Sequence, residues 1–223
     1  MGRAVIFDID GTLYRPNHFA LRLIASDPFH ICMLARERIC RKRLQGREFA
    51  CGKDYYDNLF SLMGRGSSRR AERCRKWFWE IYLPAQVRII REQFKARPHI
   101  VELILKLRKD GWLVAVLSDY GLAAEKLKAC GLENLHFDAV LESPDAGGLK
   151  PCPRTFLNVC EHLGVEPQDA LMIGDKVSTD GGSIDAGLQF IHLIEKESQR
   201  GCDGPAVNDM LWSEILDFFH LWD

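Results

Sequence analysis

The stretch AVIFDIDGT, residues 4–12, decides the architecture of this chain. Its apolar residues predict a strand over Ala4–Ile9 that is covered on both faces, as strands are in a parallel sheet. Asp8 and Asp10 stand two residues apart at the end of this run, so an extended backbone points both side chains to the same side. Gly11 then allows the backbone to turn sharply away. The stretch therefore predicts a buried strand that brings two carboxylates to one edge of a sheet.

Strand and helix patterns alternate through the second half of the chain. Four more apolar runs predict strands, at Trp112–Ser118, Phe137–Glu142, Ala170–Ile173 and Gln189–Ile194. Helical patterns lie between and after them, at Pro98–Asp110, Leu122–Cys130, Pro153–Leu163 and Asn208–Phe219. This alternation predicts a doubly wound, Rossmann-like α/β fold with a parallel sheet and right-handed crossovers.

Residues 15–97, called the helical insert below, interrupt this alternation and contain no convincing strand. Four helices are predicted there, at Asp27–Leu44, Lys53–Met63, Ser68–Leu83 and Pro84–Phe94. The insert holds 19 of the 30 lysines and arginines but only 8 of the 31 acidic residues. We therefore predict two domains with different tasks, an α/β core of residues 1–14 and 98–223 and an all-α domain of residues 15–97.

The composition excludes several classes of protein. With 47% hydrophobic and 27% charged residues, the chain is neither disordered nor fibrous. The longest apolar run has six residues and no secretory signal is visible, so we expect a cytoplasmic protein that does not span a membrane. Eight cysteines form no C-x-x-C pair and are expected to be reduced structural thiols. The alternative is a zinc site, which would use Cys32, Cys40, Cys51 and Cys74 without the usual ligand spacing.

Polar side chains follow the ends of three predicted strands, and a lysine precedes the Pro153 helix. In an open parallel sheet, ligands bind at the carboxyl ends of the strands. Carboxylates from separate segments that converge with one lysine indicate a Mg²⁺ site beside an anion site. The cation and the lysine would keep a nucleophilic aspartate ionised, so that it can attack phosphorus. The residues in question are Asp8, Asp10, Ser118, Lys150, Asp175 and Asp180.

Four ordered motifs resemble those of the haloacid dehalogenase superfamily, in its phosphatase branch. They are FDIDGTL from residue 7, Ser118, Lys150 within GLKPCP, and GDKVSTD up to Asp180. The helical insert resembles the α-helical cap that this family carries after its first motif. The resemblance implies a phosphatase of small phosphorylated substrates.

The resemblance also implies a catalytic role for four residues. Asp8 would be the nucleophile, and Asp10 would act as general acid and base. Ser118 would donate a hydrogen bond to a phosphoryl oxygen, and Lys150 would pair with both the nucleophile and the phosphate. Dehalogenating relatives lack the acid at the position of Asp10, so dehalogenation is not expected.

The implied Mg²⁺ ligands are Asp8, the backbone carbonyl of Asp10, and Asp175, with Asp180 supporting that ligand shell. The segment that follows Asp180 is one residue shorter than in the family's motif. Two roles therefore stay open for Asp180, as a direct ligand or as a support. A third interpretation makes it a plain N-cap of the segment 183–186.

Three other functions use the same features. A phosphomutase would share the chemistry, and a phosphonate-cleaving relative would need a lysine of the insert such as Lys53 as a Schiff base. A regulatory protein would use the basic insert to bind a partner. Nucleic acid is a less favoured partner, because the aromatic residues 77–79 beside the basic run are more typical of a helical core. Asp119 is expected to shape a loop, and the seven histidines to be structural or exposed.

Overall fold

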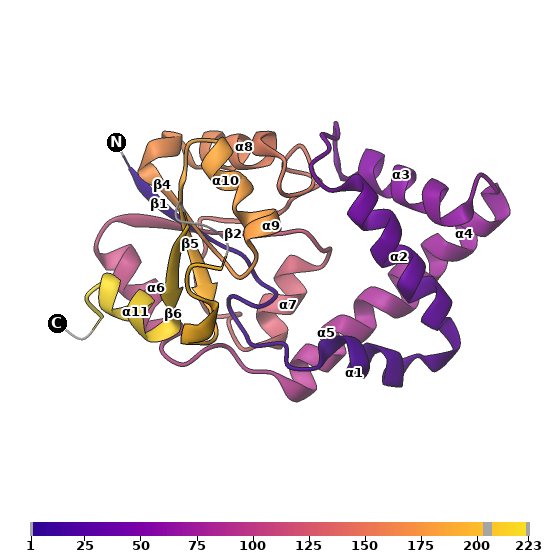
Figure 1. Cartoon of the computed structure of the whole chain (residues 1–223), viewed down its shortest axis with the longest axis horizontal. Helices are drawn as coiled ribbons and strands as arrows, with labels where there is room; N and C mark the ends of the chain where they lie inside the picture. The colour runs from indigo at the N-terminus through magenta and orange to yellow at the C-terminus, as the bar shows by residue number, and fades with distance from the viewer. Residues whose placement is uncertain (1, 203–206, 222–223) are drawn as a thin grey trace.

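A six-stranded parallel sheet forms one half of the computed structural model, which describes residues 2–202 and 207–221 (Figure 1). The strand order is β3-β2-β1-β4-β5-β6, and each neighbouring pair is parallel. The strands are β1 (Arg3–Phe7), β2 (Trp112–Ser118), β3 (Ala139–Glu142), β4 (Ala170–Gly174), β5 (Gln189–Ile194) and β6 (Asn208–Leu211). The predicted doubly wound α/β fold is confirmed.

Helices cover both faces of this sheet, and β1 shows how its residues divide between them. Val5 and Phe7 pack in one apolar cluster with α6 (Ile100–Lys109) and α11 (Trp212–Phe218), whereas Ala4 and Ile6 pack in a second cluster with α8 (Pro153–Leu163). All four side chains are fully buried, as the unbroken apolar run predicted. The helices of this half are α6 (Ile100–Lys109), α7 (Ala123–Ala129), α8 (Pro153–Leu163), α9 (Val177–Asp180), α10 (Gly182–Asp185) and α11 (Trp212–Phe218).

The closing helix predicted over Asn208–Phe219 is wrong in its first four residues. These residues form β6, which pairs with β5, and the helix begins only at Trp212. Strand pairing satisfies the backbone hydrogen-bonding groups at the edge of β5, and a long-range contact of this kind outweighs local helix periodicity. The pairing also buries Asp209, whose carboxylate accepts a hydrogen bond from the backbone N–H of Gly201 at 2.6 Å.

The helical insert lies at the other end of the molecule from the sheet (Figure 1). Its described residues contain no named strand. None of the helices traced in the described part of the chain is long and apolar enough to cross a membrane. The helices of the insert are α1 (Phe19–Ser26), α2 (Ile31–Leu44), α3 (Gly52–Gly64), α4 (Ser68–Trp77) and α5 (Leu83–Gln93). The division into two domains stays a prediction.

The first helices of the insert differ from those predicted. Helix α1 was not predicted, and the helix expected from Asp27 begins at Ile31 after a 3₁₀ turn at Pro28–His30. The Asp27 side chain does not cap a helix. Its carboxylate instead binds the His30 ring at 2.7 Å and accepts a hydrogen bond from the Trp77 indole at 3.1 Å. Asp27, which was predicted to cap a helix, therefore binds the distant Trp77 side chain instead.

Aromatic side chains form the core of the insert. Trp77 and Phe78 are buried, and the Trp77 ring stacks on Tyr82 with the ring centroids 5.0 Å apart. A π-helical turn at Phe78–Tyr82 joins α4 directly to α5, so the helices predicted over 68–83 and 84–94 follow one another without a loop. Trp77 and Phe78 thus pack inside the insert as predicted, whereas Trp79 is 39% exposed.

The cysteines do not form the alternative zinc site. All eight are free thiols, and Cys40 and Cys74 are buried while Cys32 and Cys51 are exposed. Within residues 2–202 and 207–221, the one group of side chains placed to share a metal ion consists of carboxylates. Five of the eight thiols are buried, as structural cysteines are, whereas Cys32, Cys51 and Cys202 are exposed.

The chain enters and leaves the insert through two segments that lie side by side. Tyr14 and Ala96 form an antiparallel bridge. The buried Arg97 guanidinium donates hydrogen bonds of 2.7 Å to the carbonyl oxygens of residues 11 and 12. It also forms an ion pair with Glu195, in the loop after β5. Arg97 thus connects the turn after Asp10 with the C-terminal end of the insert and with the loop that follows β5.

Candidate active site

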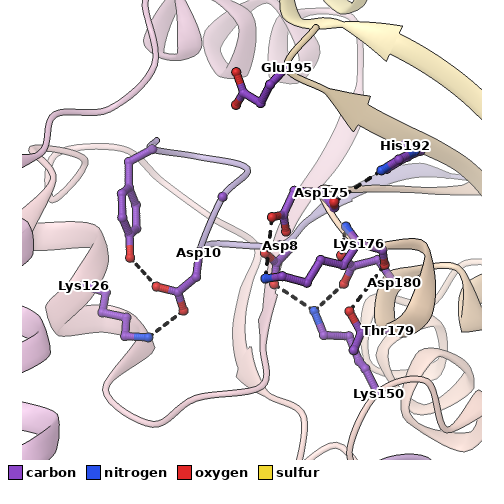
Figure 2. A network of polar contacts seen from close by, with 12 residues as sticks. Asp8, Asp10, Lys126, Lys150, Asp175, Lys176, Thr179, Asp180, His192 and Glu195 are labelled. Carbon is purple, nitrogen blue, oxygen red and sulfur yellow. Dashed lines mark hydrogen bonds and ion pairs between the residues drawn. The ribbon is translucent and has the colours of Figure 1, made fainter. Parts of the chain in front are cut away.

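The strand order brings the predicted site residues to one edge of the sheet. β1 lies between β2 and β4, so Asp8, Ser118 and Asp175 all stand at neighbouring carboxyl ends. Lys150 comes from the loop before α8, and Asp180 ends α9. Figure 2 shows Asp8, Lys150, Asp175 and Asp180 pointing toward one another.

Lys150 is the centre of the polar contacts at this edge. Its buried ammonium donates hydrogen bonds to Asp8 at 2.8 Å and to Asp180 at 2.6 Å (Figure 2). Burial would lower the pKa of Lys150, but the two carboxylates outweigh it and raise that pKa well above its usual range. The Asp119 carboxylate accepts a hydrogen bond from the Lys150 backbone N–H at 3.2 Å, which shapes the loop as predicted.

Three carboxylates form a compact oxygen cluster. One ligand oxygen from each of Asp8, Asp175 and Asp180 lies within 4.8 Å of the others. Burial raises the pKa of Asp8 to about 7, with the Asp180 charge adding to the effect and the Lys150 ammonium opposing it. Burial and the Asp8 charge raise the pKa of Asp175 to about 6. The Oδ1 atom of Asp175 is buried without a hydrogen-bond partner among the described residues. Hard oxygen donors with one unpartnered atom fit a divalent cation such as Mg²⁺.

Asp180 faces this cluster and does not cap the segment that follows it. Its Oδ1 atom binds Lys150, and its Oδ2 atom accepts a hydrogen bond from the Lys176 backbone N–H at 3.2 Å. The N-cap of the next helix is Gly181, and no side chain caps that helix. The structure thus removes the interpretation of Asp180 as a plain N-cap.

The Asp10 carboxylate is held apart from the cluster. Lys126 donates a hydrogen bond to its Oδ2 atom at 2.6 Å, and the Tyr14 hydroxyl donates one to Oδ1 (Figure 2). Burial would raise the pKa of Asp10, but the Lys126 ammonium and these two hydrogen bonds outweigh it and lower the pKa. Asp10 is therefore ionised, with its side chain directed away from the nucleophile expected at Asp8.

Lys126 belongs to this site although its position was not predicted from the sequence. This lysine is fully buried on α7, a helix that was predicted over Leu122–Cys130. Positions 123, 126 and 130 are three and four residues apart, so they share one helix face. Ala123 and Cys130 are also buried, and a lysine on such a face needs an acidic partner. A lysine that shares a helix face with Ala123 and Cys130 was therefore the signal in the sequence that could have revealed Lys126.

Ser118 keeps a hydrogen atom for a ligand. Its side chain is fully buried, and its hydroxyl oxygen accepts a hydrogen bond from the Tyr120 backbone N–H at 3.2 Å. A hydroxyl that accepts in this way can still donate its own proton.

A buried histidine supports the Asp175 backbone. His192 on β5 binds the Asp209 carboxylate through Nδ1 at 2.7 Å, and its Nε2 atom lies 3.3 Å from the Asp175 carbonyl oxygen. His192 was expected to be merely structural or exposed. Its partner Asp209 was hidden within a segment predicted to be helical.

A cavity of about 220 Å³ lies between the sheet and the helical insert, next to Asp10. Asp10, Tyr120 and Lys176 line it from the sheet side, and Arg38, Tyr82 and Gln86 line it from the insert. Lys53 does not line this cavity. Its exposed side chain instead pairs with Asp57 at 2.6 Å on the surface of α3, which gives no support to a Schiff base there.

Comparisons with known proteins agree with the resemblance drawn from the motifs. A family model described as haloacid dehalogenase-like hydrolase matches residues 3–184. Human N-acylneuraminate-9-phosphatase is 28% identical over 236 residues, which cover 96% of this chain and 91% of the human protein. The mouse N-acylneuraminate-9-phosphatase is 30% identical over 117 residues, 52% of this chain. That second match spans about half of the mouse protein, 47% of its length.

Solved structures support the fold. A HAD phosphatase from Thermococcus onnurineus superposes with a TM-score of 0.63 at 24% sequence identity, over 98% of each chain. At this level of identity the likeness concerns the arrangement of helices and strands alone.

Proposed function

Since the chain belongs to the haloacid dehalogenase-like hydrolase family, we propose that it is a Mg²⁺-dependent phosphatase that hydrolyses a small phosphomonoester. The observation that supports this most is the meeting of Asp8, Lys150 and Asp175 at one sheet edge. A nucleophile, a fixed cation and a carboxylate cluster are the groups that phosphoryl transfer requires. The phosphatase names of the relatives point in the same direction.

In the first half of the proposed reaction, an Asp8 oxygen attacks phosphorus and the bond to the leaving-group oxygen breaks. The leaving oxygen takes a proton from Asp10 and departs as an alcohol. Asp8 then carries the phosphoryl group as a mixed anhydride. Lys150 and the Ser118 hydroxyl stabilise the charge on the phosphoryl oxygens through hydrogen bonds.

In the second half, water attacks the phosphorus of the aspartyl-phosphate. Asp10 accepts a proton from this water, inorganic phosphate leaves, and the Asp8 carboxylate is restored. Proton transfer of this kind typically contributes ~10²–10⁴-fold to the rate. Asp10 must leave Lys126 and turn toward Asp8 for either step, since its carboxylate is bound to that lysine. Its pKa is lowered there, so Asp10 must also gain a proton before the first step; in later turnovers this is the proton that it accepted from water.

Asp8 and Asp175 would hold the Mg²⁺ ion, with the Asp10 backbone carbonyl as a further ligand. Asp180 would support this shell through Lys150 or bind the ion directly. The unpartnered Oδ1 atom of Asp175 and the close spacing of the three carboxylates suit this assignment. When bound, the ion would neutralise the crowded carboxylates and polarise a phosphoryl oxygen.

The test is phosphate release from p-nitrophenyl phosphate by the Asp8→Asn variant. We expect a loss of at least ~10³-fold, because an amide cannot form the anhydride. EDTA should abolish the activity of the unchanged protein, and added Mg²⁺ should restore it. Asp185→Asn is the matched control, because Asp185 is an exposed aspartate close in sequence to the motif. Full activity of Asp8→Asn would exclude the proposed mechanism.

The products separate this function from the alternatives. A phosphatase releases free phosphate without any bisphosphate primer, whereas a phosphomutase needs the primer and gives an isomerised sugar phosphate. A binding protein would be retained on heparin at moderate salt and would turn over no phosphoester. The presence of Asp8, Asp10, Lys150 and Asp175 together argues against a protein that has lost catalysis.

A further inference from the structure

The cavity beside Asp10 contains a buried amide without a partner. Gln86 on α5 is 2% exposed, and its Nε2 atom has no hydrogen-bond partner among the described residues. A buried amide that forms no hydrogen bond destabilises the folded protein, because water satisfies the same amide in the unfolded chain. Gln86 lines the cavity, so a bound molecule is the natural partner for this group.

Most other polar groups that line the cavity are already used within the protein. The Tyr82 hydroxyl donates a hydrogen bond to Glu37 at 3.5 Å, and the Tyr14 hydroxyl donates one to Asp10. Lys176 faces the carboxylate cluster, with its ammonium 3.5 Å from Asp175. Arg38 differs from these, because it is an exposed residue and none of the hydrogen bonds or salt bridges among the described residues involves its side chain. The cavity therefore offers a ligand the Gln86 amide, the Arg38 guanidinium and the Tyr120 hydroxyl, since no hydrogen bond among the described residues uses that hydroxyl.

The cavity is small and partly apolar. Its volume of about 220 Å³ lies below the ~300–1,000 Å³ of sites for drug-sized ligands. Phe19, Leu23 and Leu34 form its apolar wall. A leaving group of a few carbon atoms suits this space.

We propose that Gln86 and Arg38 select the leaving group, and that this group is a small hydroxy acid with a free hydroxyl besides the one that carries the phosphate. A substrate hydroxyl both donates and accepts, so it can satisfy the Gln86 amide. A guanidinium binds carboxylates and phosphates through paired charge-assisted hydrogen bonds, and the phosphate of the substrate is already assigned to Lys150 and Ser118, which leaves a carboxylate for Arg38. This inference rests on the proposed phosphatase function for the phosphate end of the substrate.

Three matched phosphomonoesters isolate the two contacts. 3-Phosphoglycerate carries the hydroxyl and the carboxylate, phosphorylated 3-hydroxypropionate lacks the hydroxyl, and glycerol 3-phosphate lacks the carboxylate. The unchanged protein should prefer 3-phosphoglycerate to each of the others by about 10- to 100-fold in kcat/KM. Comparing ratios within one protein sample removes any general loss of folding or catalysis.

The variants assign each preference to one residue. Gln86→Met keeps the side-chain length without the amide, and it should erase the preference for the hydroxyl. It should also raise Tm, because it removes a buried amide that has no hydrogen-bond partner. If Gln86 only stabilised the fold, its replacement would lower Tm instead. Arg38→Met should erase the preference for the carboxylate. Gln93→Met on α5 and Arg43→Met on α2 are the controls, because both residues are exposed and do not line the cavity.

The outcomes distinguish this inference from the proposed function. If p-nitrophenyl phosphate is hydrolysed but glycerol 3-phosphate is the best of the three esters, the hydroxy-acid assignment is overturned. The same follows if Gln86→Met lowers Tm and leaves the ratios unchanged. If no phosphoester is turned over with Mg²⁺ present, the phosphatase function itself fails.

Discussion

Replacing Lys126 by methionine removes the partner that keeps Asp10 ionised inside the protein. The ammonium of Lys126 is fully buried and lies 2.6 Å from the Asp10 carboxylate, whose side chain is 18% exposed. Breaking a buried ion pair from one side typically costs 3–5 kcal/mol, because the remaining charge stays buried without compensation. Since Asp10 retains some contact with water, we expect about 3 kcal/mol, the lower end of that range.

The pH dependence of this loss follows from the pKa of Asp10. In the folded protein that pKa is lowered, so the ion pair contributes stability above the unfolded value of about 3.9. This contribution disappears as the pH falls through the folded pKa. Without Lys126, burial raises the pKa of Asp10, and acid protonates the stranded carboxylate. The destabilisation should therefore be larger at pH 7 than at pH 4.

Urea unfolding of metal-free protein measures the effect. The single variants Lys126→Met and Asp10→Asn, with their double variant, form a thermodynamic cycle that should give a coupling above about 1.5 kcal/mol. Lys128→Met on the same helix is the control, because that lysine is exposed. A coupling near zero, or a loss that is equal at both pH values, would refute the argument that Lys126 stabilises the charge on Asp10.

Four further predictions concern the metal site and its supports. Mg²⁺ at a hundred times its Kd should add about 2.7 kcal/mol of stability, seen as a rise in Tm that Asp175→Asn abolishes. In EDTA, Tm should fall as the pH rises from about 4 to about 7. The reason is that the pKa of Asp8 is raised to about 7 and that of Asp175 to about 6, so the folded state binds more protons than the unfolded state in this pH range. Asp8→Asn should flatten this dependence of Tm on pH. Arg97→Met should lower the free energy of unfolding in urea by about 2–4 kcal/mol, because the guanidinium donates to two carbonyls and pairs with Glu195. Asp209→Asn should weaken Mg²⁺ binding about 10- to 100-fold by calorimetry, because it loosens the histidine behind Asp175.

The sheet could be predicted because its strands are buried on both faces. Continuous apolar runs such as Trp112–Ser118 and Gln189–Ile194 leave no competing pattern, and the structure has strands with those bounds. The site followed from the same logic, since polar residues at the ends of such runs must meet at one edge. Lys150, Asp8 and Asp180 are in contact, as that argument required.

The errors lie where a distant contact determines local structure. Asn208–Leu211 looks helical by itself and becomes a strand because β5 offers an edge to pair with. Asp27 looks like a helix cap, but Trp77 and His30 take its carboxylate. Lys126 looks like an ordinary helix lysine until Asp10 is seen beside it. In each case at least one partner lies far away in the sequence, namely β5 for residues 208–211, Trp77 for Asp27 and Asp10 for Lys126.

The bridge between Tyr14 and Ala96 has a consequence for how such a protein can diversify. Because both ends of the helical insert leave the sheet at one spot, the segment between them can be lengthened, shortened or exchanged while every strand keeps its neighbours. Gln86 and Arg38 belong to the exchangeable part, whereas Asp8, Lys150 and Asp175 belong to the constant part. Under the proposed assignments, the chemistry and the choice of molecule would thus be encoded in separable stretches of one gene.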